Sequence, residues 1–142
     1  MSSAKYQDFR TRVIHECQSP ADWGGATLPP IYQSAANLHQ TAENLSDTFA
    51  GKTSDHIYMR LTNPTNQALE KKLASLEGGA GAVVTSSGMA AITNACMALL
   101  RAGDEFVTGN SLFMSSYVLF ANIFKKYDIT ARMVESTEMT AL

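Results

Sequence analysis

The chain has 142 residues and a formal net charge of −2, with 45% apolar and 17% charged residues. This length suffices for one domain with a hydrophobic core but not for two such domains. The near-neutral charge, without a long cluster of Lys and Arg, argues against a nucleic-acid-binding protein. The charged fraction lies below the roughly 25% of an average soluble domain, which favours burial of part of the surface in an assembly.

The two cysteines, Cys17 and Cys96, are too few for a disulfide framework, so reduced thiols in a cytosolic protein are the default expectation. The first residues contain no apolar signal segment, and no run of about 18 apolar residues occurs in the sequence. We therefore expect a cytoplasmic protein that works without a membrane.

Residues 1–57 show weak periodicity and many loop signals, among them SPADWGG and ENLSDTFAGKTSD. The pair Pro29–Pro30 fits neither the interior of a helix nor a central strand. We predict that residues 1–57 form an extended arm that runs over another part of an assembly.

The stretch from Tyr58 to Thr65 reads YMRLTNPT. Alternation along an extended segment would place Tyr58 and Arg60 on one side of it. A guanidinium fork and a phenol together suit a phosphate or a carboxylate. The alternative is a surface arginine paired with an acidic residue, with the tyrosine at the edge of the core.

Clear helix and strand signals follow this stretch. Asn63 can cap a helix that has Pro64 at its first position, Leu69 and Leu73 belong to its apolar stripe, and Gly78 ends it. The predicted order beyond it is strand 80–87, helix 88–100, strand 103–109, helix 115–127 and strand 129–135. Strands that alternate with helices predict an α/β fold with a mostly parallel sheet and flanking helices.

The turn TSSGMAA, residues 85–91, is a candidate anion site because a predicted strand passes there through two serines and a glycine into a helix. The free amides of a first helical turn and the helix dipole attract anions, and Gly88 allows close approach. The turn is neither a P-loop nor a dinucleotide fingerprint. The alternative is an ordinary packing turn of small residues.

Read in order, the motifs GATLPPIYQS, YMRLTNPT, LEKKLASLEGG, SSGMAAI, GDEFV and SLFMSSYVLF resemble the front of the transsulfuration (Cys/Met metabolism) family of enzymes that depend on pyridoxal 5'-phosphate (PLP). Within the family they are closest to O-acetylhomoserine sulfhydrylase. The resemblance implies a fold-type I, aspartate-aminotransferase-like large domain whose first part is residues 58–142. It also implies that residues 1–57 form an inter-subunit segment and that the subunits form a homodimer or homotetramer.

The resemblance assigns a cofactor site. The backbone of Ser87, Gly88 and Met89 is expected to hold the PLP phosphate, and Tyr58 and Arg60 are expected to reach that phosphate from the neighbouring subunit. A dianionic phosphate at a helix N-terminus, covered by a charged fork and a hydroxyl, agrees with the physics of anion binding.

The chain departs from the family pattern at Phe113, because it reads LFMSSY where the family usually reads LYGGTY. The resemblance implies that Phe113 stacks on the pyridoxal ring, but it lacks the phenolic O–H that would move a proton. The alternative is an ordinary core aromatic before a helix. Methionine γ-lyases often carry a cysteine where this chain has Ser115, so that activity ranks lower.

The lysine that forms the Schiff base with PLP lies downstream of the matched region in the family, as do the partners of the pyridine nitrogen and of the substrate carboxylate. We therefore expect a fragment that is inactive by itself and needs the remaining C-terminal part of the enzyme. The implied reaction is γ-substitution or elimination on an amino acid. Homocysteine or methionine formation from O-acetylhomoserine and sulfide or a thiol is favoured.

Three alternatives stay open at the level of sequence. A cystathionine γ-synthase or γ-lyase, or a methionine γ-lyase, would use the same front segment on another substrate. A catalytically incomplete fragment would bind the cofactor without chemistry. A plain phosphate- or nucleotide-binding α/β domain would retain a nucleotide and ignore PLP.

Overall fold

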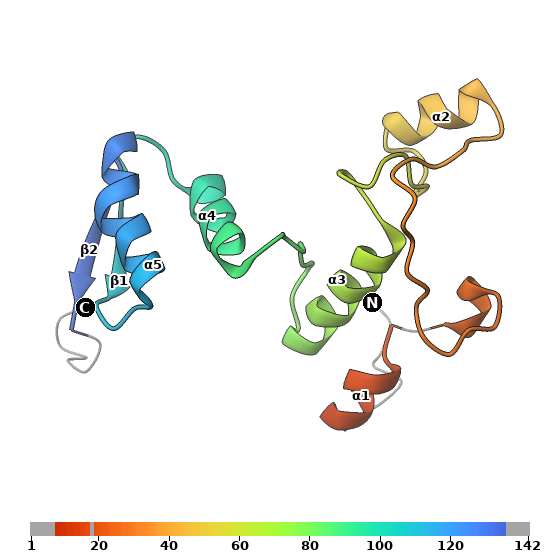
Figure 1. Cartoon of the computed structure of the whole chain (residues 1–142), viewed down its shortest axis with the longest axis horizontal. Helices are drawn as coiled ribbons and strands as arrows, with labels where there is room; N and C mark the ends of the chain where they lie inside the picture. The colour runs from red at the N-terminus through yellow and green to blue at the C-terminus, as the bar shows by residue number, and fades with distance from the viewer. Residues whose placement is uncertain (1–7, 18, 136–142) are drawn as a thin grey trace. The chain divides into compact units, whose positions relative to one another are not determined.

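The computed structural model describes residues 8–17 and 19–135. The chain divides into two compact units, Met1–Val84 and Thr85–Leu142, which we name unit 1 and unit 2. The predicted boundary after residue 57 separates an inter-subunit segment from the large domain. It therefore describes a role in the assembly and not compactness, and it stays a prediction. Figure 1 labels the helices and strands of both units.

In its described residues, unit 1 contains three α-helices, each of which begins at a capping side chain, and one 3-10 turn without such a cap. Its helices are α1 (Phe9–His15), a 3-10 turn (Pro20–Trp23), α2 (Ala42–Phe49) and α3 (Pro64–Glu77). Asp8 accepts hydrogen bonds from two amides of α1, and Thr41 accepts one from α2. Such caps satisfy amides that have no partner inside the helix.

The predicted arm over residues 1–57 is extended only in part, because α1 and α2 lie in this range. The extended character holds for the residues around Pro29–Pro30, which have no regular secondary structure. Both helices are short, with 7 residues in α1 and 8 in α2. The capping residues Asp8 and Thr41 were therefore their best local signals.

Helix α3 forms as the sequence predicts. Asn63 is its N-cap, Pro64 occupies its first position, and Gly78 ends it with φ at +67°, in the left-handed region. A residue with a Cβ adopts this conformation at a cost, which is why glycine is common there.

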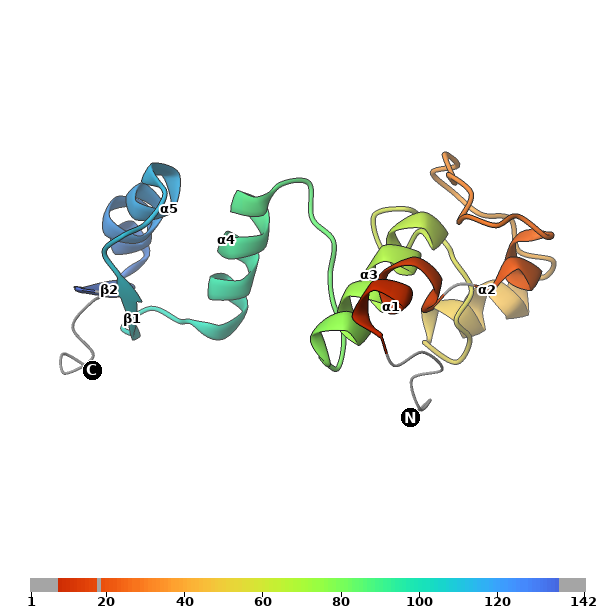
Figure 2. The same ribbon diagram turned by 90° about the horizontal axis from the view of Figure 1, so that it is seen from below.

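Helix α1 docks on α3 through polar contacts, and the two helices lie side by side in Figure 1 and Figure 2. The guanidinium of Arg12 donates to the carbonyl of Ser75 near the end of α3 and pairs with Glu16. In return, the ammonium of Lys72 donates to the carbonyls of Val13 and Ile14 at 2.9 and 3.2 Å. Each helix thus supplies a cation to carbonyls in the last turn of the other, where the helix dipole favours positive charge.

Unit 2 is a β-α-β arrangement preceded by a helix. Its elements are α4 (Gly88–Leu99), β1 (Glu105–Gly109), α5 (Met114–Val118), a π turn (Leu119–Ile123), a 3-10 turn (Phe124–Tyr127) and β2 (Thr130–Val134). Strands β1 and β2 pair in parallel, with Glu105 opposite Thr130 and Gly109 opposite Val134. The prediction of an α/β fold with a parallel sheet and helices is confirmed.

The core of unit 2 lies between the helical segment 114–127 and the sheet. Among the described residues, the buried apolar side chains are those of Leu119, Phe120, Phe124 and Ile129. Phe106 of β1 packs edge-on against Phe120, with ring centroids 5.1 Å apart. The helical connection between the two paired strands thus packs its aromatic rings against the sheet, and their burial stabilises this arrangement.

The strand predicted over residues 80–87 is not formed, because residues 81–85 have no regular secondary structure. The amide of Val84 donates instead to the side chain of Glu70, at 2.9 Å. A strand exists only where another strand pairs with it, and a β-branched run cannot specify that partner by itself.

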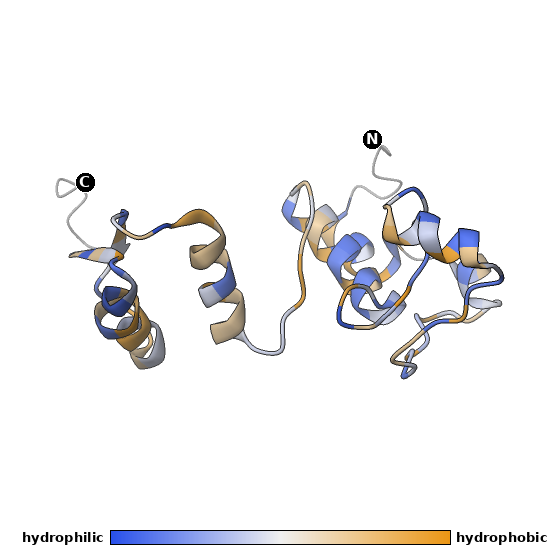
Figure 3. Cartoon of the chain, turned by 90° about the horizontal axis from the view of Figure 1, so that it is seen from above, coloured by the Kyte–Doolittle hydropathy of each residue, from blue (hydrophilic) through white to orange (hydrophobic). Residues whose placement is uncertain are grey.

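Large apolar side chains remain exposed on both units, including Leu61 at 64% and Leu99 at 80%. Figure 3 shows mostly hydrophobic colour along α4, broken by a short hydrophilic stretch. Among the described residues, no helix combines the length and the apolar character needed to cross a membrane.

Candidate anion-binding site

The first turn of α4 is capped and closed by hydroxyl groups. The side-chain oxygen of Ser87 accepts a hydrogen bond from the amide of Ala90 at 3.1 Å. The hydroxyl of Thr85 donates to the carbonyl of Ser87 at 2.8 Å. The amides of Gly88 and Met89 have no acceptor within the helix, because an α-helix leaves its first N–H groups unpaired. With the helix dipole, they form a site for an anion.

This turn is open to a ligand. Ser87 and Gly88 are exposed, and a Cβ added to Gly88 would meet no atom within 4 Å. The hydroxyl of Ser87 accepts from Ala90 but keeps its own proton, so it can still donate. Two amides and one hydroxyl can therefore donate to the same anion.

Met89 contributes its backbone to this site and its side chain to the core of unit 2. Its side chain packs against the buried cluster, and the hydroxyl of Ser116 lies 3.7 Å from its sulfur. The hydroxyl of Thr93 donates to its carbonyl at 2.8 Å. These contacts fix the orientation of the first turn of α4.

Phe113 lies immediately before α5 and is 76% exposed. Because Ser116 in α5 contacts Met89 in α4, the N-terminal ends of these two helices are neighbours. Phe113 therefore offers an open apolar ring at the end of unit 2 that carries the anion site. The alternative of an ordinary core aromatic is wrong for this unit.

Tyr58 and Arg60 belong to unit 1 and form a pair. The guanidinium carbon of Arg60 lies 5.2 Å from the centroid of the Tyr58 ring, a cation–π contact. Both side chains are exposed, and among the described residues Arg60 makes no ion pair. A positive charge held beside a phenol and open to solvent can bind an anion.

The expectation that Tyr58 to Leu61 is extended is wrong. Tyr58 forms an isolated antiparallel bridge with Ala36, and the chain then turns. The carbonyl of Tyr58 accepts from the amides of Leu61 and Thr62 at 2.9 and 3.1 Å, which closes the turn. Arg60 and Tyr58 come together through this turn and not through strand alternation.

The structure thus brings the predicted residues together in two groups. Ser87, Gly88, Met89 and Phe113 gather in unit 2, and Tyr58 and Arg60 gather in unit 1. Each group has the exposure and the donors that its predicted role requires.

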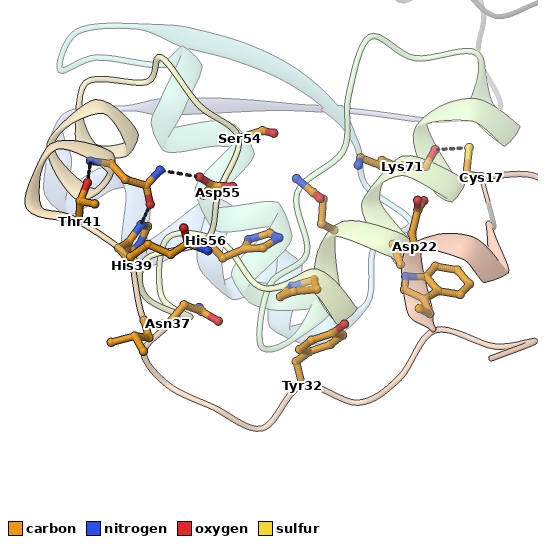
Figure 4. A pocket seen from close by; sticks show the side chains of 17 residues that line it. Cys17, Asp22, Tyr32, Asn37, His39, Thr41, Ser54, Asp55, His56 and Lys71 are labelled. Atoms are coloured by element: carbon orange, nitrogen blue, oxygen red, sulfur yellow. Dashed lines mark hydrogen bonds between the residues drawn. The ribbon is translucent and has the colours of Figure 1, made fainter. Parts of the chain in front are cut away.

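Unit 1 also contains a polar pocket that the sequence did not predict (Figure 4). Its volume is about 940 Å³. The side chain of Asn44 is hydrogen-bonded to two other side chains there. Its oxygen lies 3.0 Å from His39 Nδ1, and its nitrogen donates to Asp55 at 3.2 Å. His39 Nε2 and His56 Nδ1 are buried without a hydrogen-bond partner among the described residues. Asn44 lies in α2, whereas His39, Asp55 and His56 lie in loops, and none of them belongs to a recognisable motif that would predict the pocket.

The fold and the site together define a class: an α/β protein with an anion site at the N-terminus of a helix beside an exposed aromatic ring. The chain belongs to the Cys/Met metabolism PLP-dependent enzyme family, which matches residues 10–142.

Named relatives agree with this membership. The chain is 39% identical over 140 residues to an L-methionine gamma-lyase from Pseudomonas putida, covering 99% of this chain and 35% of the relative. It is 42% identical over 137 residues to an O-acetyl-L-homoserine sulfhydrylase from Corynebacterium glutamicum, covering 96% of this chain and 31% of the relative.

A solved structure also matches. It is assigned as an O-acetylhomoserine (thiol)-lyase from Campylobacter jejuni and contains N'-pyridoxyl-lysine-5'-monophosphate. Its TM-score is 0.86 at 28% identity, and the match covers 95% of this chain and 33% of that one. The chain therefore spans about a third of the length of the relatives that it matches.

The residues present fit the phosphate of PLP, the cofactor of the family. A phosphate needs several convergent donors and room for its oxygens. The first turn of α4 supplies two unpaired amides and a hydroxyl, and the space around Gly88 is open.

Proposed function

We propose that this chain is the N-terminal third of a PLP-dependent transsulfuration enzyme that catalyses γ-substitution on O-acetylhomoserine. In this reaction sulfide or a thiol replaces acetate at the γ-carbon, which yields homocysteine or methionine. The observation that carries the proposal is the open, donor-rich first turn of α4 in a chain of this family. The 42% identity to an O-acetyl-L-homoserine sulfhydrylase supports the choice of substrate.

The residues have distinct proposed roles. The amides of Gly88 and Met89 and the hydroxyl of Ser87 bind the PLP phosphate and fix one end of the cofactor. Arg60 adds a charged donor to the same phosphate, and Tyr58 adds a hydroxyl and holds the guanidinium by its ring.

Phe113 is proposed to lie against one face of the pyridoxal ring. Its exposed ring excludes water from that face and limits tilting of the cofactor. It has no proton to give, so this chain supplies no acid–base group at that position. When bound, PLP supplies the electron sink that allows bonds at the substrate's α- and β-carbons to be broken and remade.

We further propose that the enzyme is cytoplasmic and forms dimers that pair into tetramers. Exposed apolar side chains on both units and the charged fraction of 17% support an assembly. Tyr58 and Arg60 would then reach the phosphate bound by a neighbouring subunit.

Product analysis tests the proposed reaction. The purified enzyme that contains this chain is incubated with PLP, O-acetylhomoserine and sulfide, and homocysteine and acetate are measured. We expect both products in equal amounts, and none without PLP. Retention of a nucleotide together with indifference to PLP contradicts the proposal and favours a plain nucleotide-binding domain.

A methionine γ-lyase is the second candidate, favoured by the 39% identity to such an enzyme. It predicts methanethiol, ammonia and 2-oxobutyrate from methionine in the same assay. Elimination from methionine without homocysteine formation from O-acetylhomoserine would replace the first proposal by this one.

A further inference from the structure

Asn63 joins two segments of unit 1 that are far apart in the sequence. It is 6% exposed, one of the few buried polar residues among the described ones. Its side-chain oxygen accepts from the amides of Thr65 and Asn66 at 2.9 and 3.4 Å, and so caps α3. Its side-chain nitrogen donates to the carbonyl of Tyr32 at 3.1 Å. The cap of α3 is therefore also an anchor for the segment around Tyr32.

Thr65 completes this anchor. Its hydroxyl accepts from the amide of Tyr32 at 2.9 Å and donates to the carbonyl of Pro30 at 2.9 Å. Both polar groups of the Tyr32 backbone are thus bound by side chains at the start of α3. A segment with no regular secondary structure satisfies its backbone in this way instead of through a sheet.

The anchored segment holds Tyr58 from the other direction. The carbonyl of Ala35 accepts from the amide of Met59 at 2.8 Å, and the amide of Asn37 donates to the carbonyl of Ile57 at 2.9 Å. These bonds form the isolated bridge that positions Tyr58. Segments 30–37 and 57–65 are thus fastened to each other at two places, and the turn that presents Arg60 lies between the two fastenings.

We propose that Asn63 and Thr65 are positioning residues for the phosphate-binding pair Tyr58 and Arg60. They bind the segment 30–37 to α3, and this segment in turn holds Tyr58 and the turn that carries Arg60. The inference rests on the proposed role of the pair in binding the PLP phosphate. Without the anchor, the pair loses its fixed position, and part of the binding energy is spent on ordering it.

Thr65→Val tests the anchor, because valine has nearly the shape of threonine but lacks both hydrogen bonds. In the PLP holoenzyme that contains this chain, we expect the dissociation constant of PLP to rise by about tenfold. Thr65→Ser keeps the hydroxyl and should restore most of the affinity. Thr65→Ala removes the same hydroxyl and replaces Thr65→Val if that variant does not fold.

Thr48→Val is the matched control. Thr48 is a buried threonine of unit 1, whereas Thr65 is half-buried, and the Thr48 hydroxyl donates to the carbonyl of Asn44 at 2.8 Å, away from the anchor. We expect Thr48→Val to lower the melting temperature as much as Thr65→Val does, without changing PLP affinity.

A double-mutant comparison separates positioning from general stability. In an Arg60→Ala background, Thr65→Val should weaken PLP binding less than it does in the parent protein, because only Tyr58 is left to be positioned. If Thr65→Val leaves PLP affinity unchanged while Arg60→Ala lowers it, the anchor is not a positioning device, and the proposed site stands. An equal loss in both backgrounds also overturns the inference. Unchanged affinity in Arg60→Ala alone overturns the role of the pair itself.

Discussion

Arg60 is the side chain whose chemistry depends most on what binds beside it. Its guanidinium lies over the ring of Tyr58 and, among the described residues, pairs with no carboxylate. Unpaired arginines at a surface cost little, so stability gives no reason for this arrangement. A phosphate ligand does give one, because a guanidinium fork matches its oxygens.

Arg60→Ala should therefore weaken PLP binding by about 2 kcal/mol and change the free energy of unfolding by less than about 0.5 kcal/mol. Arg60→Lys keeps the charge but loses the fork, so its affinity for PLP should lie between those of the unmutated protein and of Arg60→Ala. Equilibrium titration of the apoenzyme and of both variants with PLP measures these affinities. Equal affinities in all three proteins contradict a phosphate-binding role for Arg60.

The exposed ring of Phe113 leaves room for the hydroxyl group of a tyrosine at this position. At 76% exposure, Phe113→Tyr introduces no clash in unit 2 and should leave the melting temperature unchanged. If the ring faces the cofactor, the new phenol, with a pKa near 10 in the absence of perturbation, adds an ionisation to the alkaline limb of the pH–rate profile. The profile of kcat/KM between about pH 6 and 10 is the measurement. Superimposable profiles would show that Phe113 does not face the reacting groups.

Helix α4 and helix α3 allow a matched test of two glycines. Gly78 has φ at +67°, so Gly78→Ala should destabilise the protein by about 1 kcal/mol and leave PLP affinity unchanged. Gly88 begins α4 with open space around it, so Gly88→Ala should not lower stability, since alanine is the better helix former.

Gly88→Ala should nevertheless weaken PLP binding, because the added methyl group lies at the turn that the phosphate must approach. Thermal unfolding and PLP titration of both variants check this crossed pattern. Tight PLP binding by Gly88→Ala would remove the first turn of α4 from the proposed site.

What the sequence could predict differs from element to element. Helix α3 was predictable at both ends because Asn63, Pro64 and Gly78 each act locally on the backbone. The missing strand near Val84 was not, because its amide binds Glu70 and strand pairing depends on distant residues. The same holds for the site: the turn at Ser87 is visible in sequence, whereas the Tyr32 anchor and the polar pocket need a folded loop.

On the scale of the whole protein, this chain spans about a third of the length of the relatives that it matches, and we propose that the lysine that binds PLP lies outside it. Borohydride reduction of the holoenzyme followed by peptide mapping should therefore find PLP on a lysine outside these 142 residues. Labelling of Lys71, Lys72, Lys125 or Lys126 would contradict the proposed division of roles.

The central claim is that Ser87, Gly88 and Met89 of one subunit and Tyr58 and Arg60 of another bind the same phosphate. Hybrid dimers test it directly when one chain carries Arg60→Ala and the other Gly88→Asp. An aspartate at the first position of a helix is compatible with folding, because it complements the dipole, but it repels a phosphate.

If the site is shared, each hybrid dimer has one site in which both groups are intact. Differently tagged chains allow the hybrid to be purified and its tightly bound PLP to be counted. We expect one tightly bound PLP per hybrid dimer and none in either parent homodimer. If the hybrid binds PLP as weakly as both parents, the two groups do not meet across subunits, and the claim is wrong.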